Sequence, residues 1–166
     1  MTITLARIDD RVIHGQTMTR WTKQYAVQGI LVVSDEVAKD ELRKKVLKAA
    51  AAELKLGIYT VEQAKESIPK AVKSNKNFFL ITDSPAYFAQ LAEAGIDFGK
   101  VVNVGPISGG TGAINVARNV ALTQNEYDAF EKLETSGYRV TFQLLPDDEK
   151  NHGKLSRKNT IRIILM

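Results

Sequence analysis

A segment near the N-terminus places several reactive side-chain types next to one another. Asp9, Asp10, Arg11 and His14 fall within one short stretch of the chain. A neutral imidazole has a lone pair on one ring nitrogen and an unperturbed pKa of about 6.5, so His14 can act as a nucleophile. The forked guanidinium of Arg11 suits phosphate oxygens, and either Asp9 or Asp10 could orient the imidazole by accepting from its second nitrogen. The group could therefore accept a phosphoryl unit. The alternative is a surface turn capped by an aspartate, with Arg11 solvated.

This segment lies where a strand is expected to end and a helix to begin. Residues 2–8 are rich in β-branched side chains, and apolar residues recur at helical spacing over 18–25. If the helix begins near Gly15, the free backbone amides of Gly15 and Gln16 favour an anion beside His14. The local pattern thus predicts an anion site at a strand-to-helix turn.

The rest of the chain predicts the elements that hold this turn in place. Short β-branched runs predict strands at residues 2–8, 30–33, 57–60, 78–81 and 101–104. Each of the first four is followed by a helical stretch, and such alternation requires crossover connections and a largely parallel sheet. We therefore expect one α/β domain over residues 1–166, a doubly wound, mainly parallel sheet with helices on both faces. Ligands bind beyond the carboxyl ends of such strands, where His14 lies.

Four expected helices carry capping signals, because a side-chain oxygen can satisfy the free amides of a first turn. The capping residues are Ser34, Thr60, Ser84 and Thr123. Thr60 and Thr123 have a Gln or Glu three residues later, at capping-box spacing, and a proline follows Ser84. Ser84 also lies on the rim expected to hold His14, where its hydroxyl could donate to a phosphoryl group.

The last third of the chain has a different character. Residues 114–122 alternate between apolar and polar or small side chains, which predicts one strand with a polar face and allows an antiparallel edge. Gly137 is expected to end the preceding helix, and 138–145 to return as a strand. The tail 151–166 is polar and basic, and its 161–165 run could form a final strand.

Composition excludes several classes of function. The 166 residues contain no Cys, which excludes disulfides, thiolate metal sites and cysteine nucleophiles. The net charge of +4 is too small to indicate nucleic-acid binding. No apolar run approaches the roughly 20 residues of a membrane-spanning helix, and no signal peptide is visible, so a cytoplasmic protein is expected. The 105–112 segment matches neither nucleotide-loop pattern. His152 is the only other histidine, so we expect no metal site and no cofactor.

A receiver-like signalling or regulatory domain is the alternative function. Paired acids such as Asp9 and Asp10 also follow the first strand of phospho-aspartate receivers. The expected third strand, however, ends in Tyr59 and Thr60 rather than in an aspartate that could be phosphorylated. The expected fifth strand is followed by Gly105 and a proline rather than by a lysine.

The run RIDDRVIHGQ at residues 7–16, followed by Trp21 and Thr22, carries a resemblance that covers roughly residues 2–148. Further matching stretches lie at 33–41, 102–105 and 137–140. With these residues the chain resembles the IIB component of the mannose/fructose/sorbose family of sugar phosphotransferase systems. The match does not extend to residues 106–112 or 151–166.

The resemblance implies a phosphocarrier that receives a phosphoryl group on His14 from a phosphohistidine of a IIA component. The group then passes to a sugar bound by the membrane components IIC and IID. Asp10 and Arg11 are the implied supporting residues, and the IIA donor would be a separate chain. The protein would work in the cytoplasm, peripherally at the membrane permease. Neither the sugar nor the oligomeric state can be inferred from the sequence.

Overall fold

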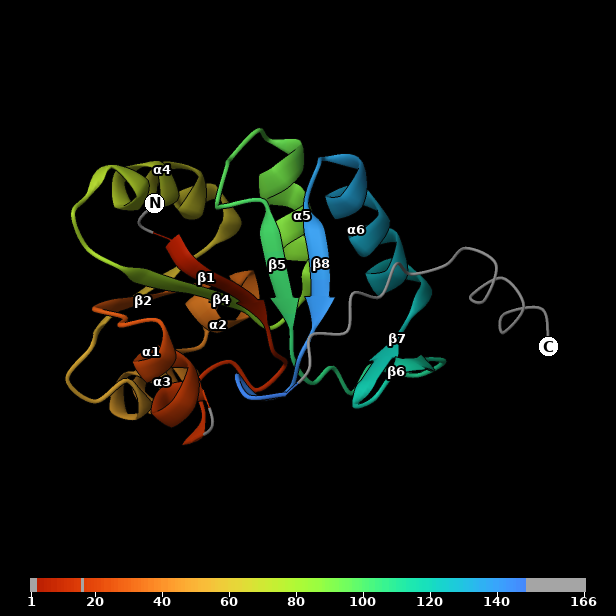
Figure 1. The fold of residues 1–166 in the computed structure, drawn as a ribbon, viewed down its shortest axis with the longest axis horizontal. Helices are drawn as coiled ribbons and strands as arrows, with labels where there is room; N and C mark the ends of the chain where they lie inside the picture. The colour runs from red at the N-terminus through yellow and green to blue at the C-terminus, as the bar shows by residue number, and fades with distance from the viewer. Residues whose placement is uncertain (1–2, 16, 149–166) are drawn as a thin grey trace.

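A six-stranded, fully parallel sheet forms the centre of the computed structural model, which describes residues 3–15 and 17–148 (Figure 1). The strand order is β3-β2-β4-β1-β5-β8. The strands are β1 (Ile3–Ile8), β2 (Gly29–Val33), β3 (Lys55–Tyr59), β4 (Phe78–Thr82), β5 (Val101–Val104) and β8 (Arg139–Phe142). The parallel sheet expected from the alternation of strands and helices is confirmed.

Helices cover both faces of this sheet, as expected for a doubly wound fold (Figure 1). The helices are η1 (Thr17–Trp21, a π-helical turn), α1 (Thr22–Gln24), α2 (Asp35–Lys39), α3 (Glu41–Ala50), α4 (Val61–Lys73), α5 (Pro85–Glu93) and α6 (Gln124–Thr135). Apolar side chains of α4, α5 and α6 share one core cluster with one face of the sheet. Those of η1, α2 and α3 share a second cluster with the other face.

The order of the strands creates a crevice beside the end of β1. The chain leaves β1 and β2 toward the β3 edge of the sheet, whereas it leaves β4 and β5 toward the β8 edge. β1 and β4 are neighbours, with Ile8 opposite Thr82 at their carboxyl ends. Because the chain leaves these neighbours in opposite directions, their ends form the place where such sheets bind ligands. The 9–14 loop and Ser84 both follow these strand ends.

The capping signals in the sequence are confirmed. The side chains of Ser34, Thr60, Ser84 and Thr123 each accept a hydrogen bond from an amide in the first turn of α2, α4, α5 and α6. Thr60 and Thr123 form complete capping boxes. Gly137 follows α6 with φ of 88°, a conformation that glycine adopts without steric cost.

The 114–122 segment differs from the single strand expected for it. It forms β6 (Ile114–Ala117) and β7 (Val120–Leu122), an antiparallel pair in a sheet of its own. The chain reverses at Arg118 and Asn119, and Asn119 takes a φ of 60°. The antiparallel pairing is therefore present, but the expected position at an edge of the main sheet is wrong. The pair lies beyond the carboxyl ends of β5 and β8 (Figure 1).

Two further expectations change in detail. The strand expected over 138–145 ends at Phe142, because the carbonyls of Gln143 and Leu144 accept hydrogen bonds from a side chain of β1 instead of a neighbouring strand. The helix expected over 18–25 is the π-helical η1 followed by the short α1. The tail 151–166, including His152 and the 161–165 run, lies outside the described residues.

Candidate functional site

His14 lies in the loop that follows β1 and contacts one buried carboxylate. Its Nε2 atom is 3.0 Å from Oδ2 of Asp9, and the Asp9 side chain is fully buried while that of His14 is 11% exposed. When Nε2 carries the proton and donates it to Asp9, the lone pair of the neutral ring is on Nδ1. Within the described residues Nδ1 has no hydrogen-bond partner. The arrangement therefore presents a free ring nitrogen as a nucleophile.

Asp9 is held from several directions, so it can fix the imidazole. Its Oδ1 accepts from the backbone amide of Arg11 at 3.0 Å. Its own amide donates to the carbonyl of Thr82 at 2.9 Å, and its carbonyl accepts from the amide of Val12 at 2.9 Å. The bond to Thr82 ties the loop to the end of β4, the neighbouring strand, and the other two close the turn after Asp9.

The backbone of the loop is strained at Val12. This fully buried, β-branched residue has φ of 58°, in the left-handed region that such side chains rarely adopt. Such a conformation costs on the order of 1–3 kcal/mol and persists only where the surroundings enforce it. Val12 and Ile13 are packed in an apolar cluster with Trp21, while Arg11 is exposed on one side of them. The buried side chains of Val12 and Ile13 thereby anchor the loop to this apolar cluster.

Arg7 is the largest polar element of the site and is almost completely buried. Its Nε atom lies 3.6 Å from Oδ2 of Asp9, and its guanidinium carbon lies 4.5 Å from the centre of the Trp21 ring. The guanidinium donates to Oδ1 of Asn103 and to the carbonyls of Gln143 and Leu144. Burial lowers the pKa of Arg7 to about 10, which the charge of Asp9 partly opposes, so Arg7 is cationic at neutral pH.

The two residues that follow Asp9 have separate positions. Arg11 is exposed, and its guanidinium has no ion pair or hydrogen bond within residues 3–15 and 17–148. Asp10 points to the segment after β5, where its Oδ2 accepts from the hydroxyl of Ser108 and from the Ser108 amide at 2.8 Å. Of the two aspartates that could orient the imidazole, the one in contact with it is Asp9.

The remaining candidates lie around the same edge. Gly15 is exposed, and an added Cβ there would meet no atom within 4 Å. Gln16 lies outside the described residues. Ser84 caps α5, its Oγ accepting from the amide of Ala86 at 3.3 Å. The structure thus brings His14, Arg11 and Gly15 together in one loop and places Ser84 at the end of the adjacent strand.

The sequence interpretation missed Arg7 as a component of the site. One signal was available, since Arg7 is a charged residue inside a strand of the predicted parallel sheet, whose two faces helices are expected to cover. Charged side chains are almost never fully buried unless they are paired. Its partners Asn103 and Gln143 lie so far along the chain that only the folded sheet brings them together.

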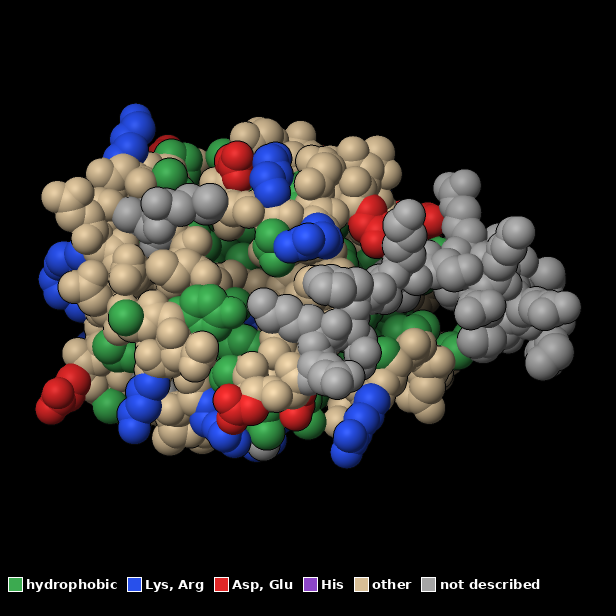
Figure 2. All heavy atoms as spheres, viewed as in Figure 1, with side chains coloured by type: hydrophobic (Ala, Val, Ile, Leu, Met, Phe, Trp, Pro, Cys, Tyr) green, Lys and Arg blue, Asp and Glu red, His purple; other side chains and the backbone are tan. Residues whose placement is uncertain are grey.

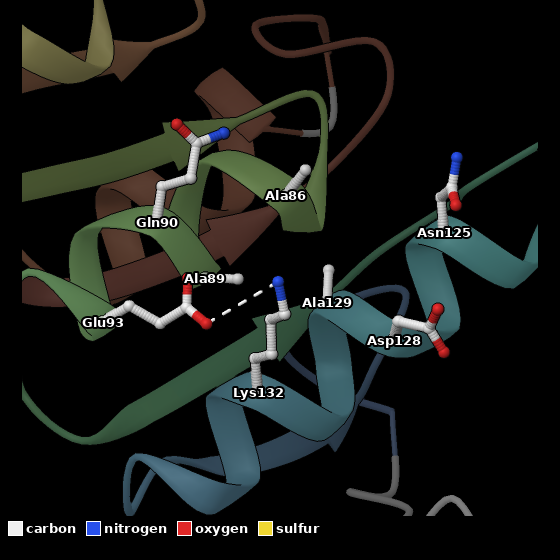
Figure 3. A pocket seen from close by; sticks show the side chains of 8 residues that line it. All are labelled: Ala86, Ala89, Gln90, Glu93, Asn125, Asp128, Ala129 and Lys132. Atoms are coloured by element: carbon white, nitrogen blue, oxygen red, sulfur yellow. Dashed lines mark ion pairs between the residues drawn. The ribbon is translucent and has the colours of Figure 1, made fainter.

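Other features of the surface lie apart from this loop. A pocket of about 280 Å³ between α5 and α6 is floored by alanines and crossed by an ion pair at 3.6 Å between Glu93 and Lys132 (Figure 3). None of the candidate site residues lines it. On the face in Figure 2, Lys and Arg side chains are scattered rather than gathered in a patch.

The described residues contain neither a group of metal ligands nor a membrane-spanning helix. No group of three or more His, Asp or Glu side chains in the described part of the chain could hold a metal ion. No helix among the described residues has the length and apolar character needed to cross a membrane.

Comparison with known proteins gives consistent relatives. The family model described as "PTS system sorbose subfamily IIB component" matches residues 3–161. The fructose-specific EIIB component of Bacillus subtilis is 36% identical over 149 residues, covering 89% of this chain and 91% of that protein. The mannose-specific EIIAB component of Escherichia coli K12 is 36% identical over 154 residues, which are 90% of this chain but 46% of that protein.

A solved structure has the same fold over nearly its whole length. The IIB domain of the sorbose permease from Klebsiella pneumoniae superposes with a TM-score of 0.86 and 28% identity. The superposition covers 96% of this chain and 98% of that domain. Sequence and fold thus indicate the same group of proteins.

Proposed function

Because this chain belongs to the sorbose subfamily of PTS IIB components, phosphocarriers of sugar uptake, we propose that His14 is the residue that carries its phosphoryl group. The contact between Nε2 and Asp9 is the observation that supports this proposal most directly. It leaves Nδ1 as the nitrogen with a free lone pair, so the phosphoryl group is expected on Nδ1. No finding supports the receiver-like alternative.

The proposed reaction is an exchange of one phosphorus–nitrogen bond for another. The lone pair of His14 Nδ1 attacks the phosphorus of a phosphohistidine on the IIA donor, and the donor's N–P bond breaks with its electron pair returning to the donor imidazole. The phosphorylated ring of His14 then has cationic character, which the buried carboxylate of Asp9 stabilises through Nε2–H. In the second step the oxygen of a sugar hydroxyl attacks the phosphorus, the N–P bond breaks with its electron pair returning to Nδ1 of His14, and the hydroxyl proton passes to solvent.

The supporting residues would bind the three phosphoryl oxygens and hold the loop. Arg11 is the proposed charge stabiliser, because its exposed guanidinium is not engaged by any described group and suits phosphate oxygens. Asp10 would hold the loop in place through Ser108. The proposal also includes the amides of Gly15 and Gln16 and the hydroxyl of Ser84, which follows the neighbouring strand.

The partners are proposed from the family. The mannose-specific relative of Escherichia coli is named as a fused EIIAB component, whereas this chain covers only 46% of it. The fructose-specific relative of Bacillus subtilis is named as an EIIB component and is covered over 91% of its length, and by analogy we propose a IIA donor on a separate polypeptide. We propose that the membrane components IIC and IID bind the sugar and dock this chain. The chain would then work in the cytoplasm at the permease.

Phosphorylation by a small donor tests the assignment without the partner proteins. Potassium phosphoramidate transfers its phosphoryl group to imidazole nitrogen and releases ammonia. We expect wild type to gain one acid-labile, base-stable phosphoryl group whose ³¹P signal is that of an Nδ1-linked phosphohistidine. His14→Ala should gain none. Arg11→Ala should react about 100-fold more slowly, the order of loss found when one charge-stabilising donor is removed.

One control variant makes the outcome decisive. His152→Ala should be labelled like wild type, since it removes the only other imidazole. Label that resists acid, or that persists in His14→Ala, would contradict the proposal.

A further inference from the structure

The contacts of Arg7 point to a role beyond holding the sheet together. Arg7 on β1 is one end of a row of three polar residues that crosses β1, β5 and β8. It is paired in register with Asn103, and Asn103 is paired with Thr141. All three side chains are buried. A guanidinium in this place must be compensated, because an unpaired buried charge is strongly destabilising.

The positive charge of Arg7 is balanced by Asp9, the carboxylate that orients His14. Oδ2 of Asp9 lies 3.0 Å from Nε2 of His14 and 3.6 Å from Nε of Arg7, so the same oxygen faces both side chains. At 3.6 Å the contact with Arg7 is an ion pair rather than a hydrogen bond, because Nε has no hydrogen-bond partner among the described groups. The hydrogen-bonding capacity of Oδ2 thus remains directed to His14, while the charge of Arg7 attracts the same carboxylate.

Hydrogen bonds and a ring contact fix the guanidinium of Arg7. Its terminal nitrogens donate to Asn103 and to the carbonyls of Gln143 and Leu144, and its guanidinium lies over Trp21. A Cβ added to Gly105 would overlap the guanidinium of Arg7, so a side chain at position 105 must displace it. Contacts from β5, from the segment after β8 and from Trp21 therefore fix the guanidinium beside Asp9.

We propose that Arg7 is a positioning residue of the phosphoryl relay, fixing Asp9 so that Asp9 holds the imidazole of His14 with Nδ1 free. Arg7 does not touch the phosphoryl group in this scheme. Its effect reaches the reacting atom through one carboxylate, so it should alter the rate of transfer and the protonated nitrogen of the ring, but not the binding of the donor. This inference rests on the proposed role of His14.

The test uses two variants that disturb Arg7 in different ways. Arg7→Lys retains a charge but loses the fork, and Gly105→Ala retains the arginine but displaces it. With saturating phosphoramidate, both should be phosphorylated about 10- to 100-fold more slowly, the range typical of residues that orient a reactive ligand through a second contact. The half-saturating donor concentration should be unchanged.

Two readouts separate positioning from a purely structural effect. Long-range ¹H–¹⁵N spectra resolve only two imidazoles, since the chain has two histidines, and should show one Nε2–H form of His14 in wild type and a mixture in both variants. In the Asp9→Asn background, Arg7→Lys should cause little further loss of rate, because the carboxylate through which Arg7 acts on His14 is already absent.

A matched control is Arg20→Lys, which changes an exposed arginine paired with Asp147 in the segment after β8. It should leave rate and ring form unchanged. Circular dichroism and urea unfolding establish that each variant is folded. Folded variants with wild-type rate and ring form, or losses that add fully to that of Asp9→Asn, would overturn the role of Arg7. A wild-type protein that takes no phosphoryl group on His14 would instead overturn the proposed function itself.

Discussion

At the scale of the residue, the site depends on the different surroundings of two adjacent aspartates. Asp9 is completely buried and contacts His14, whereas Asp10 is half-buried and contacts Ser108. The chain turns at Asp10, beyond the end of β1, so the two side chains face different neighbours. The buried one has the greater electrostatic effect, because charge interactions are stronger where water is excluded.

This difference predicts unequal effects of matched substitutions. Asp9→Asn should slow phosphorylation of His14 by about 10- to 100-fold, because the amide can present a donor to Nε2 and disturb the ring's protonated form. Asp10→Asn should slow it by no more than about 5-fold, equivalent to a single neutral hydrogen bond of about 1 kcal/mol. The measurement is the rate of ³¹P incorporation from phosphoramidate. Equal losses in the two variants would contradict the assignment of Asp9.

Sequence alone could propose His14 as the phosphorylated residue but not how its ring is held. The residue types and the strand-to-helix position single out the imidazole, whereas the choice between Asp9 and Asp10 depends on the turn at Val12, whose positive φ no sequence signal announces. A charge at Arg7 inside a predicted strand indicates a buried partner, but the partners themselves could not be identified because they come from β5 and from the segment after β8.

At the scale of the element, helix starts were the most predictable features and the loops the least. A cap is a contact within four residues, so Ser84 and Thr123 signal their helices locally. The reversal at Arg118 and Asn119 lacks the Asn-Gly or Asp-Gly pair that marks a tight hairpin, so the 114–122 segment reads as one strand. The π-helical turn after His14 has no recognisable sequence pattern.

The cap at Ser84 gives a prediction that concerns α5. Its hydroxyl accepts from the amide of Ala86, and Phe88 and Leu91 of the same helix are fully buried, so a loosened first turn affects the core. Ser84→Ala should lower the free energy of unfolding by about 1 kcal/mol. Ser84→Asn, a residue that caps equally well, should remain close to wild type. Urea unfolding measures both, and equal stability of the Ala variant and wild type would show that the cap contributes nothing.

At the scale of the whole molecule, the strand order brings together chemistry that is scattered along the chain. β1 carries His14 at its end, while its neighbours β4 and β5 supply Ser84 and Ser108 just beyond their own ends. The parallel arrangement puts all these ends at one edge, and the alternation of strands and helices was enough to predict it. The order of the strands was not predictable in this way, because it depends on packing between distant segments.

The same edge contains a carboxyl group whose burial affects the stability of the whole fold. Asp83 follows β4, its Oδ1 is buried without a hydrogen-bond partner among the described residues, and its Oδ2 lies 3.7 Å from the guanidinium of Arg43 on α3. Burial raises the pKa of Asp83, and this outweighs the lowering by the Ser34 hydroxyl and by Arg43.

A raised pKa of an acid in the folded state has a definite sign for stability. Between the ordinary aspartate pKa of about 3.9 and the raised folded value, the folded protein binds more protons than the unfolded chain. The contribution of Asp83 to the free energy of unfolding is therefore largest in acid and is lost as the pH rises through this interval. Asp83→Asn removes the titration, so the variant should gain stability relative to wild type as the pH rises from about 4 and stay at a constant difference above the folded pKa.

Urea unfolding at a series of pH values measures the difference, with the exposed Asp147→Asn as a control that should follow wild type. A difference between Asp83→Asn and wild type that stays flat from acid to neutral pH, or that shifts in favour of wild type as the pH rises, would mean that burial of Asp83 is not what governs its titration.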